Sequence, residues 1–473
     1  MRKQIIQNQF RYRRIGERFL ATAEHGAFHF FMEKEFKKFC DGRLKNKPLI
    51  EKGFFITNSN RERIKSLLKS KKKFLSQGTS LHIIVVTLRC NEKCIYCHAS
   101  SRGIAEKGFD MDIKTAKKVV DFIFQTPSKN ISIEFQGGEP LLNFNVIKYI
   151  ATYANSINKK KKKNLLMTLV TNMSLMTRER LRYLVRKRIG ICTSLDGTME
   201  IHQLNRPCSD YEKVAYWINA AREEYVKQKI DDRRINALLT VTKKTLPYPR
   251  EIVDSYLQLG LDGIHIRFLN KLGYALEQDS AIGYKSSEFI KFWKTALDYI
   301  IDLNYKGIHF KERMAYIMLL KIFAQEDPNY LDLRSPCGAV IGQLAYNYNG
   351  DIYSCDEARM LSDDTFKLGN IHDINTQESA SYFKIVSSQK SCSIISSSIN
   401  DTQFCDFCAY KPYCGVCPVC NYAEHGSVIT PVPHTRHCQI YKAMFTYIFE
   451  KLSDEKARQV FSSWLSAPID KVI

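Results

Sequence analysis

The sequence predicts an α/β fold in which a partial (β/α)6 barrel lies between a small N-terminal α+β module and a C-terminal cysteine-rich domain. Three observations predict it. Short apolar runs alternate with amphipathic helical patterns from residue 81 to about residue 300. Three cysteines follow the first apolar run directly. Nine of the fifteen cysteines lie between Cys337 and Cys438, where long periodic runs are scarce.

Six apolar runs are the predicted strands of the barrel. Each is short and rich in β-branched residues, as the buried strands of parallel sheets are. They occupy residues 81–88, 131–135, 165–171, 189–195, 235–241 and 263–269. Because repeated β-α units form parallel sheets with right-handed crossovers, we expect functional groups at the carboxyl ends of these strands.

Amphipathic patterns predict the helices. Apolar residues recur three or four positions apart in segments 112–125, 177–187, 211–229, 248–259, 286–305 and 439–452. Asp112 directly precedes the first pattern and is a favourable N-cap residue. The lysine run 159–163 comes before the third strand and is predicted to be a solvated turn. A contact of this run with phosphate or an acidic peptide is the alternative.

The length of 473 residues predicts two or three domains. The expected units are an N-terminal module (1–78), the barrel (79–310), the cysteine-rich domain (330–445) and a C-terminal helical tail (446–473).

The N-terminal module is predicted to be winged-helix-like. Residues 10–31 predict two β segments around a turn at Glu24, His25 and Gly26, helices follow, and 69–78 is predicted to be a polar linker. Such a module can bind a peptide by adding its strand to a sheet edge. A plain extension packed on the barrel is the alternative.

The charge balance is strongly basic. Lys and Arg number 71 and Asp and Glu 49, a formal net charge of +22. This charge indicates an acidic peptide, nucleic acid or anionic lipid as partner, or a solvated basic surface. The basic residues are dispersed and are not interleaved with aromatic residues in the way that stacks bases, so nucleic acid is disfavoured.

The chain is expected to be cytoplasmic. Its N-terminus has no apolar core of signal-peptide length, and no run approaches the ~18 apolar residues of a membrane span. In the cytoplasm, fifteen cysteines predict metal ligation or redox chemistry rather than disulfides.

The three cysteines after the first strand, hereafter the loop cysteines, are Cys90, Cys94 and Cys97. Their C-x3-C-x2-C spacing can wrap three corners of a cubic iron–sulfur cluster. Structural clusters have four thiolate ligands, so one iron would stay open for a small molecule. Zinc is the alternative, but it favours four ligands from paired C-x2-C hooks.

Polar groups follow the next strands. The second strand leads into a segment that we call the glycine turn: Gly137, Gly138, Glu139 and Pro140. Two glycines at a strand end let a ligand approach the backbone closely, and Glu139 can accept hydrogen bonds from an ammonium group. Asn172, Ser194 and Arg206 come after the third and fourth strands. They suit ribose hydroxyls and a carboxylate, although each could also be an ordinary cap or turn residue.

The loop cysteines, with Tyr96 before the last of them, and the glycine turn resemble the radical S-adenosylmethionine (SAM) superfamily over residues 80–300. The resemblance implies a [4Fe-4S] cluster on the loop cysteines, with the amino and carboxylate groups of SAM on the open iron. The glycine turn would meet the methionine amine, and Tyr96 would lie near the adenine. Asn172, Ser194 and Arg206 would be candidates for the ribose and carboxylate. The protein would then direct a 5′-deoxyadenosyl radical at one C–H bond.

The C-terminal cysteines resemble the SPASM domain of peptide-modifying radical enzymes, which holds two auxiliary [4Fe-4S] clusters. By that resemblance one cluster would be bound by Cys405, Cys408, Cys414 and Cys438, hereafter the first auxiliary set. Cys337 and Cys355 would hold the other, with Cys417 or Cys420. The alternative is a zinc site on Cys405, Cys408, Cys414 and Cys417.

This chain departs from the usual pattern in two ways. The usual C-x3-C spacing after Cys414 would put a ligand at Pro418, which has Cys417 and Cys420 on either side. The residues just before Cys337 also supply no cysteine. The second auxiliary cluster is therefore expected to have three cysteine ligands and an open iron. Cys40, Cys192, Cys208 and Cys392 fit neither pattern and are expected to be ordinary thiols.

Asp356 directly follows Cys355 and is a candidate general base. In sulfatase-maturing relatives an aspartate at the corresponding place is thought to take the substrate proton. A salt-bridged turn is the alternative here.

Several segments, among them 10–28, 134–144, 335–360 and 408–419, resemble the His-Xaa-Ser system radical SAM maturase across nearly the whole chain. This implies an oxidoreductase that cross-links or oxidises a ribosomally made precursor peptide. The implied partners are that peptide, a second radical SAM enzyme and a flavodoxin- or ferredoxin-type reductant. A formylglycine-forming sulfatase maturase is the alternative enzyme, and an electron-transfer or nucleic-acid-binding protein the alternative outside catalysis.

Overall fold

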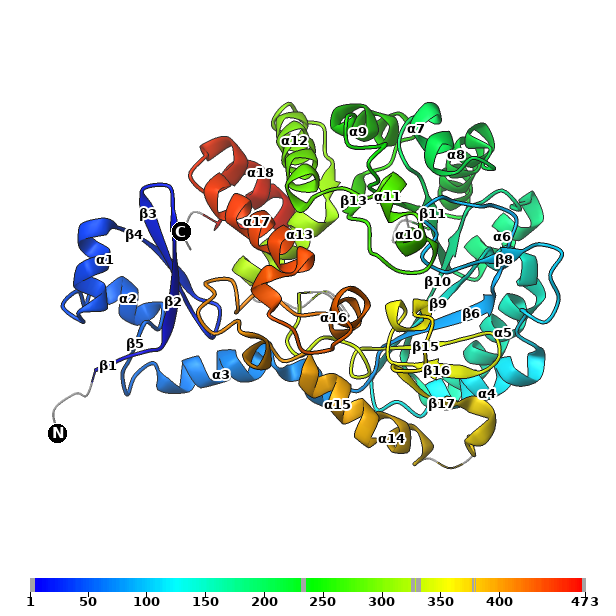
Figure 1. Cartoon of the computed structure of the whole chain (residues 1–473), viewed down its shortest axis with the longest axis horizontal. Helices are drawn as coiled ribbons and strands as arrows, with labels where there is room; N and C mark the ends of the chain where they lie inside the picture. The colour runs from blue at the N-terminus through cyan, green and yellow to red at the C-terminus, as the bar shows by residue number, and fades with distance from the viewer. Residues whose placement is uncertain are drawn as a thin grey trace.

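The computed structural model describes residues 5–230, 235–324, 328, 333–376, 378 and 380–469. At its centre is a ten-stranded sheet in the order β14-β13-β12-β11-β10-β9-β6-β15-β16-β17 (Figure 1). The strands are β6 (Leu81–Thr87), β9 (Asn130–Gly137), β10 (Asn164–Thr171), β11 (Ile189–Ser194), β12 (Asn236–Thr240), β13 (Gly263–Arg267), β14 (Lys311–Glu312), β15 (Gln343–Tyr346), β16 (Asp351–Tyr353) and β17 (Lys367–Asn370). All neighbours from β14 to β15 pair in parallel, whereas β16 and β17 are antiparallel additions.

The six predicted strands correspond to β6 and β9 to β13, to within two residues at each end. Helices cover the outer face of this curved sheet (Figure 1). They are α4 (Ile113–Ile123), α5 (Phe144–Lys161), α6 (Arg178–Arg186), α8 (Tyr211–Lys227), α9 (Pro249–Gln258) and α12 (Ser286–Tyr305). The short helices α7 (Met199–Asn205), α10 (Tyr274–Glu277) and α11 (Asp279–Ile282) pack instead beside the loop that carries Cys90, Cys94 and Cys97. All the predicted barrel helices are present, and the sequence analysis missed α5.

The lysine run is not a free turn. Three of its residues form the last turn of α5, and Lys162 ends the helix in the left-handed conformation with φ +49°. Lys163 Nζ donates to the carbonyls of Thr126 and Ser128 at 2.7 and 2.6 Å. Cations are favourable at a helix C-terminus because of its partial negative charge, which explains their gathering here.

Alternate residues of each strand face the helices or the inside of the barrel. In β9, Ile133 and Phe135 are fully buried against the helices, whereas Glu134 and Gln136 are only half-buried. The same alternation recurs in β11 and β13. The inner face, hereafter the lumen, is therefore polar and partly open to solvent, because the barrel does not close.

The N-terminal module has its own three-stranded antiparallel sheet, in the order β2-β3-β4. Its elements are β1 (Ile6–Gln7), β2 (Phe10–Ile15), β3 (Arg18–Ala23), β4 (Phe28–Met32), α1 (Glu33–Cys40), α2 (Lys47–Glu51), β5 (Phe55–Ile56) and α3 (Arg61–Lys71). The first predicted β segment is in fact a hairpin, because Gly16 takes φ +57° and turns the chain. The predicted linker is wrong: 69–78 ends α3 and continues as a 3-10 turn that buries Phe74.

The cysteine-rich region extends the barrel sheet. β15 pairs in parallel with β6, with Leu344 opposite His82. A buried hydrogen bond of 2.9 Å joins His82 Nδ1 to the Tyr346 hydroxyl. The region is also more regular than expected, since α14 (Ser381–Val386), α15 (Gln389–Ser397) and α16 (Pro418–His425) were not predicted. The predicted closing helix and helical tail are present as α17 (Arg436–Lys451) and α18 (Glu455–Leu465). The last two pack on α12 and α13 (Arg313–Leu319).

The predicted cap of α4 is confirmed. The Asp112 side chain accepts a hydrogen bond of 2.6 Å from the backbone N–H of Thr115. We predict that Asp112→Ala lowers the free energy of unfolding by about 1 kcal/mol, because that N–H loses its partner. Asp112→Asn keeps an acceptor and is the control. Equal urea midpoints for the two variants would contradict the prediction.

Candidate active site

The loop cysteines follow β6 at the carboxyl edge of the sheet. Burial raises the pKa of the Cys90 thiol to about 12 and raises the pKa of the Cys94 thiol as well. N–H donors nevertheless point at their sulfurs. The backbone N–H of Glu92 lies 3.4 Å from Cys90 Sγ, and Arg206 Nη1 lies 3.3 Å from Cys94 Sγ. Such donors suit thiolates bound to a metal cluster, so these residues fit an iron–sulfur site.

The glycine turn packs against the start of the cysteine loop. A Cβ at Gly137 would strike the carbonyl oxygen of Thr87, and one at Gly138 would strike that of Arg89. The backbone N–H of Gly138 donates to Thr87 O at 2.9 Å, and that of Glu139 to Arg89 O at 2.8 Å. Both glycines are thus required by the chain's own packing, whereas the sequence analysis had assigned them to ligand approach.

Glu139 is fully buried and binds neighbouring strand ends together. Its carboxylate accepts hydrogen bonds from Leu141 N at 2.9 Å, Thr171 Oγ1 at 2.8 Å and Asn172 N at 2.8 Å. Burial raises its pKa to about 7, although these donors act in the opposite direction. Pro140 begins the short 3-10 turn that follows. Glu139 therefore holds the end of β10 against the glycine turn.

A buried polar network supports the loop from the side of β11. Arg206 Nε donates to Asp196 Oδ2 at 2.9 Å, and its guanidinium lies 3.6 Å from Glu92 Oε2. The Tyr96 hydroxyl donates to the same Asp196 carboxylate at 2.8 Å. Glu92 and Tyr96 belong to the cysteine loop, so the network clamps the loop at two points. Asp196 is one of the polar groups predicted at the end of the fourth strand, whereas Glu92 was not predicted as a site residue.

Asn172 and Ser194 lie at the ends of neighbouring strands, as predicted. Asn172 Nδ2 lies 3.3 Å from Asn91 Oδ1 and 4.0 Å from Cys90 Sγ. The side-chain oxygen of Asn172, Oδ1, accepts a hydrogen bond of 2.6 Å from the Ser174 hydroxyl. Ser194 is half-buried at the end of β11. The structure therefore brings Asn172 and Arg206 to the loop cysteines, while Ser194 lies at the end of a neighbouring strand.

A chain of polar side chains crosses the lumen. Glu134 accepts from Gln136 Nε2 at 2.6 Å and from Thr168 Oγ1 at 3.2 Å. Gln136 Oε1 accepts in turn from Arg359 Nη2 at 3.2 Å, and Arg359 forms an ion pair of 2.7 Å with Asp356. Asp356 therefore faces the lumen. It also forms the salt-bridged turn that was the alternative to a general base.

Three further residues, Cys192, Arg267 and Glu357, lie at the lumen. Cys192 is half-buried on the inner side of β11, and burial raises the pKa of its thiol to about 12. Arg267, at the end of β13, forms an ion pair of 3.7 Å with Glu357. The only sequence signal for Cys192 and Arg267 is their position among the alternate strand residues that face the lumen.

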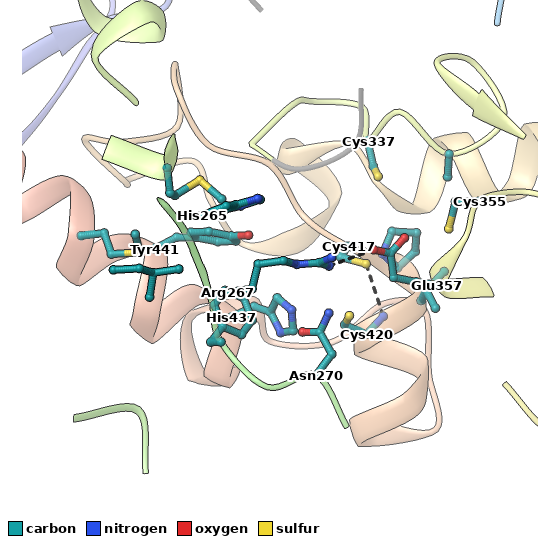
Figure 2. A pocket seen from close by; sticks show the side chains of 17 residues that line it. His265, Arg267, Asn270, Cys337, Cys355, Glu357, Cys417, Cys420, His437 and Tyr441 are labelled. Carbon is teal, nitrogen blue, oxygen red and sulfur yellow. Dashed lines mark hydrogen bonds and ion pairs between the residues drawn. The ribbon is translucent and has the colours of Figure 1, made fainter. Parts of the chain in front are cut away.

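Four cysteines line one pocket between β13 and the cysteine-rich region, hereafter the four-cysteine pocket. They are Cys337, Cys355, Cys417 and Cys420 (Figure 2). Its wall also includes His265, Arg267 and Asn270 from the barrel and His437 from α17. The expectation left open whether Cys417 or Cys420 belongs to this group, and the structure brings both into it.

The first auxiliary set lines an adjoining pocket. Its members are Cys405, Cys408, Cys414 and Cys438. Burial raises the pKa of the Cys405 thiol to about 12 and raises the pKa of the Cys414 thiol as well. The N-terminal module covers this region, since Thr22 Oγ1 donates to Ala409 O at 2.7 Å and the Tyr413 hydroxyl to Gly26 O at 2.8 Å.

Zinc gains no support from the structure. A structural zinc site needs four thiolates about 2.3 Å from one ion. Within the described part of the chain, no three His, Cys, Asp or Glu side chains are grouped so that they could hold a single metal ion. Thiols that line a wider pocket suit the corners of a cluster instead.

Comparisons with known proteins agree with this geometry. Residues 84–231 match the family model described as the radical SAM superfamily. The chain is 25% identical over 386 residues to the cysteine-type anaerobic sulfatase-maturating enzyme of Clostridium perfringens, covering 79% of this chain and 97% of that one. It is 27% identical over 326 residues to the radical SAM cyclopropyl synthase of Paramaledivibacter caminithermalis, covering 64% of each.

Two solved structures have the same fold. Native anSMEcpe with bound AdoMet superposes with a TM-score of 0.65 at 22% identity, covering 80% of this chain and 99% of that one. Streptococcus suis SuiB bound to precursor peptide SuiA superposes with a TM-score of 0.54 at 14% identity, covering 90% and 98%.

The chain has the radical SAM α/β fold, with its mixed sheet of ten strands, and it is a radical SAM enzyme. Its cofactors are a [4Fe-4S] cluster and SAM. None of the described helices is long and apolar enough to cross a bilayer.

The packing of the glycine turn generates a prediction. Gly138→Ala should displace the cysteine loop, because its Cβ would strike the Arg89 carbonyl. We expect the variant to lose about four iron atoms per chain, one cluster's worth, in an iron assay after anaerobic reconstitution. Gly108→Asn is the control, because a Cβ there meets no atom within 4 Å and asparagine tolerates the positive φ of +84°. Full iron content in Gly138→Ala would refute the packing argument.

Proposed function

We propose that this enzyme modifies a side chain of a ribosomally made peptide. One observation carries the proposal: the edge with the loop cysteines and the glycine turn opens onto a polar lumen that ends at the four-cysteine pocket. A substrate side chain in this lumen would lie between two redox groups. The relatives support a peptide substrate, since SuiB is bound to the precursor peptide SuiA and anSMEcpe to the Cp18Cys peptide.

In this proposal the loop cysteines hold three irons of the SAM cluster. The N–H donors aimed at their sulfurs support that assignment. The glycine turn would meet the methionine amine, Tyr96 would lie near the adenine, and Asn172 and Ser194 would meet the ribose. When reduced, the bound cofactors supply a 5′-deoxyadenosyl radical that abstracts hydrogen.

Arg206 has a second part in the proposal. It was expected to meet the SAM carboxylate, but its guanidinium already faces Cys94 Sγ and the Asp196 carboxylate. Its main task would then be to hold the loop and its thiolates in place. Lysine would be a poor substitute, because only the planar guanidinium can bond several partners at fixed angles.

The auxiliary cysteines would hold two more clusters. The first auxiliary set would ligate one, and Cys337 and Cys355 would ligate the other with help from Cys417 or Cys420. The adjoining pockets share Cys337 and Cys417 in their walls, which would keep the clusters near one another. Electrons could then pass between the lumen and a flavodoxin- or ferredoxin-type reductant.

The substrate is proposed to be a peptide of the His-Xaa-Ser type, modified by cross-linking or oxidation in the cytoplasm together with a second radical SAM enzyme. The N-terminal module would bind the peptide, and its contacts with the first auxiliary set give it a defined position beside the barrel. Its exposed Tyr12 on β2 offers an aromatic contact for such a peptide.

A sulfatase-type maturase is the second candidate. It is favoured by the 97% coverage of the Clostridium perfringens enzyme and by Asp356 at the lumen. Its product is an aldehyde, which reacts with a hydrazide probe, whereas a cross-linked peptide does not.

The first prediction from this proposed function tests the proposal as a whole. The reduced wild-type enzyme should contain about twelve iron atoms per chain, because three cubanes hold four each. With SAM and a His-Xaa-Ser peptide it should form 5′-deoxyadenosine and a peptide lighter by two hydrogens. Cys94→Ala should abolish both products, whereas Cys392→Ala, at an exposed thiol, should leave them unchanged. No 5′-deoxyadenosine from the wild type would defeat the proposal.

The second prediction tests Asp356 as general base. Asp356→Asn should lower peptide modification about a hundredfold, because a positioned base contributes that much to proton transfer. SAM cleavage uncoupled from the peptide should continue, since the loop cysteines are untouched. Asp373→Asn, an exposed carboxyl outside the lumen, is the control. Equal product yields from the two variants would show that Asp356 takes no proton.

A further inference from the structure

The four-cysteine pocket holds one thiol more than the second auxiliary cluster was expected to use. The pattern of the sequence left a choice between Cys417 and Cys420 and implied an open iron. The structure removes the need for that choice, because both thiols reach the pocket that contains Cys337 and Cys355 (Figure 2).

The start of α16 explains how two thiols so near in sequence face one pocket. Cys417 is the N-cap residue, and its sulfur accepts a hydrogen bond of 3.4 Å from the backbone N–H of Cys420. Residues three apart at a helix start lie on the same side. Pro418 stands at the first helical position, where its fixed φ is favourable, so it serves the turn and supplies no ligand.

The other two thiols come from a different part of the fold. Cys337 is 5% exposed and Cys355 2% exposed, on either side of the β15–β16 hairpin. Two separate segments thus bring two thiols each to one place.

The pocket wall also offers a donor. His265 Nε2 is buried, and in the described part of the chain it has no hydrogen-bond partner. Buried polar atoms are rarely left without a partner, and an anionic sulfide in this pocket would provide one.

We propose that Cys337, Cys355, Cys417 and Cys420 together ligate one [4Fe-4S] cluster. One of Cys417 and Cys420 is the third ligand already expected, the other takes the place of the cysteine that is missing before Cys337, and no iron of this cluster is open to a substrate. This inference rests on the proposed function and sharpens it, because a cluster with four thiolate ligands can pass electrons but cannot bind the peptide. Substrate chemistry is then confined to the SAM side of the lumen.

The test uses the full chain with all three loop cysteines changed to alanine, hereafter the parent, so that only auxiliary clusters remain. After anaerobic reconstitution the parent should hold about eight iron atoms, and its Mössbauer and electron paramagnetic resonance spectra should not change with added cyanide. Cys417→Ala and Cys420→Ala in the parent should each lose about four iron atoms or gain a cyanide-sensitive spectrum. Cys208→Ala, at an exposed thiol, is the matched control.

Each outcome decides the matter. If the parent's spectra change with cyanide, an auxiliary iron is open and the inference is overturned. This result needs no further variant, so the misfolding of a variant cannot obscure it. If one of the two pocket variants keeps the parent's iron content and cyanide-insensitive spectra, that cysteine is no ligand and the inference fails while the auxiliary clusters stand. A parent without iron overturns both the inference and the proposed auxiliary clusters.

Discussion

The parallel pairing of β15 with β6 is the constraint on which the arrangement of the whole site depends. It is held by backbone hydrogen bonds and by the buried bond between His82 and Tyr346. Cys337 precedes β15 and Cys355 follows β16, so this pairing carries both thiols to the barrel edge. A domain joined only by a linker would leave the distance between the lumen and the auxiliary cysteines undefined.

The loop cysteines depend on a second constraint, the burial of charge beside them. Arg206, Asp196 and Glu92 are almost fully buried, and buried charges are tolerated only when they are paired. Their pairing draws the cysteine loop against β11, while the glycine turn holds it against β9. The cysteine loop is therefore held on two sides by the chain itself, which agrees with the use of rigid elements to position a reactive site.

The lumen joins these two regions with polar groups that satisfy one another. From Thr168 through Glu134 and Gln136 to Arg359, each side chain gives or receives a hydrogen bond. Such a network fixes rotamers in the space where a substrate side chain would enter. It also connects Asp356 to the strand that carries the glycine turn, so a substitution at either end should alter the hydrogen bonds at the other end.

The sequence by itself determined the six barrel strands, most of the long helices and the spacing of the cysteines, because local periodicity and ligand spacing are written in neighbouring residues. It missed α5, and it misjudged the segment 69–78 and the lysine run, whose structures depend on what packs against them. Only the tertiary structure decided that Cys417 and Cys420 share a pocket with Cys337, that Glu92 and Asp196 clamp the loop, and that Cys192 faces the lumen. These are contacts between segments far apart in the chain, and their register is set by strand pairing and burial rather than by any local pattern.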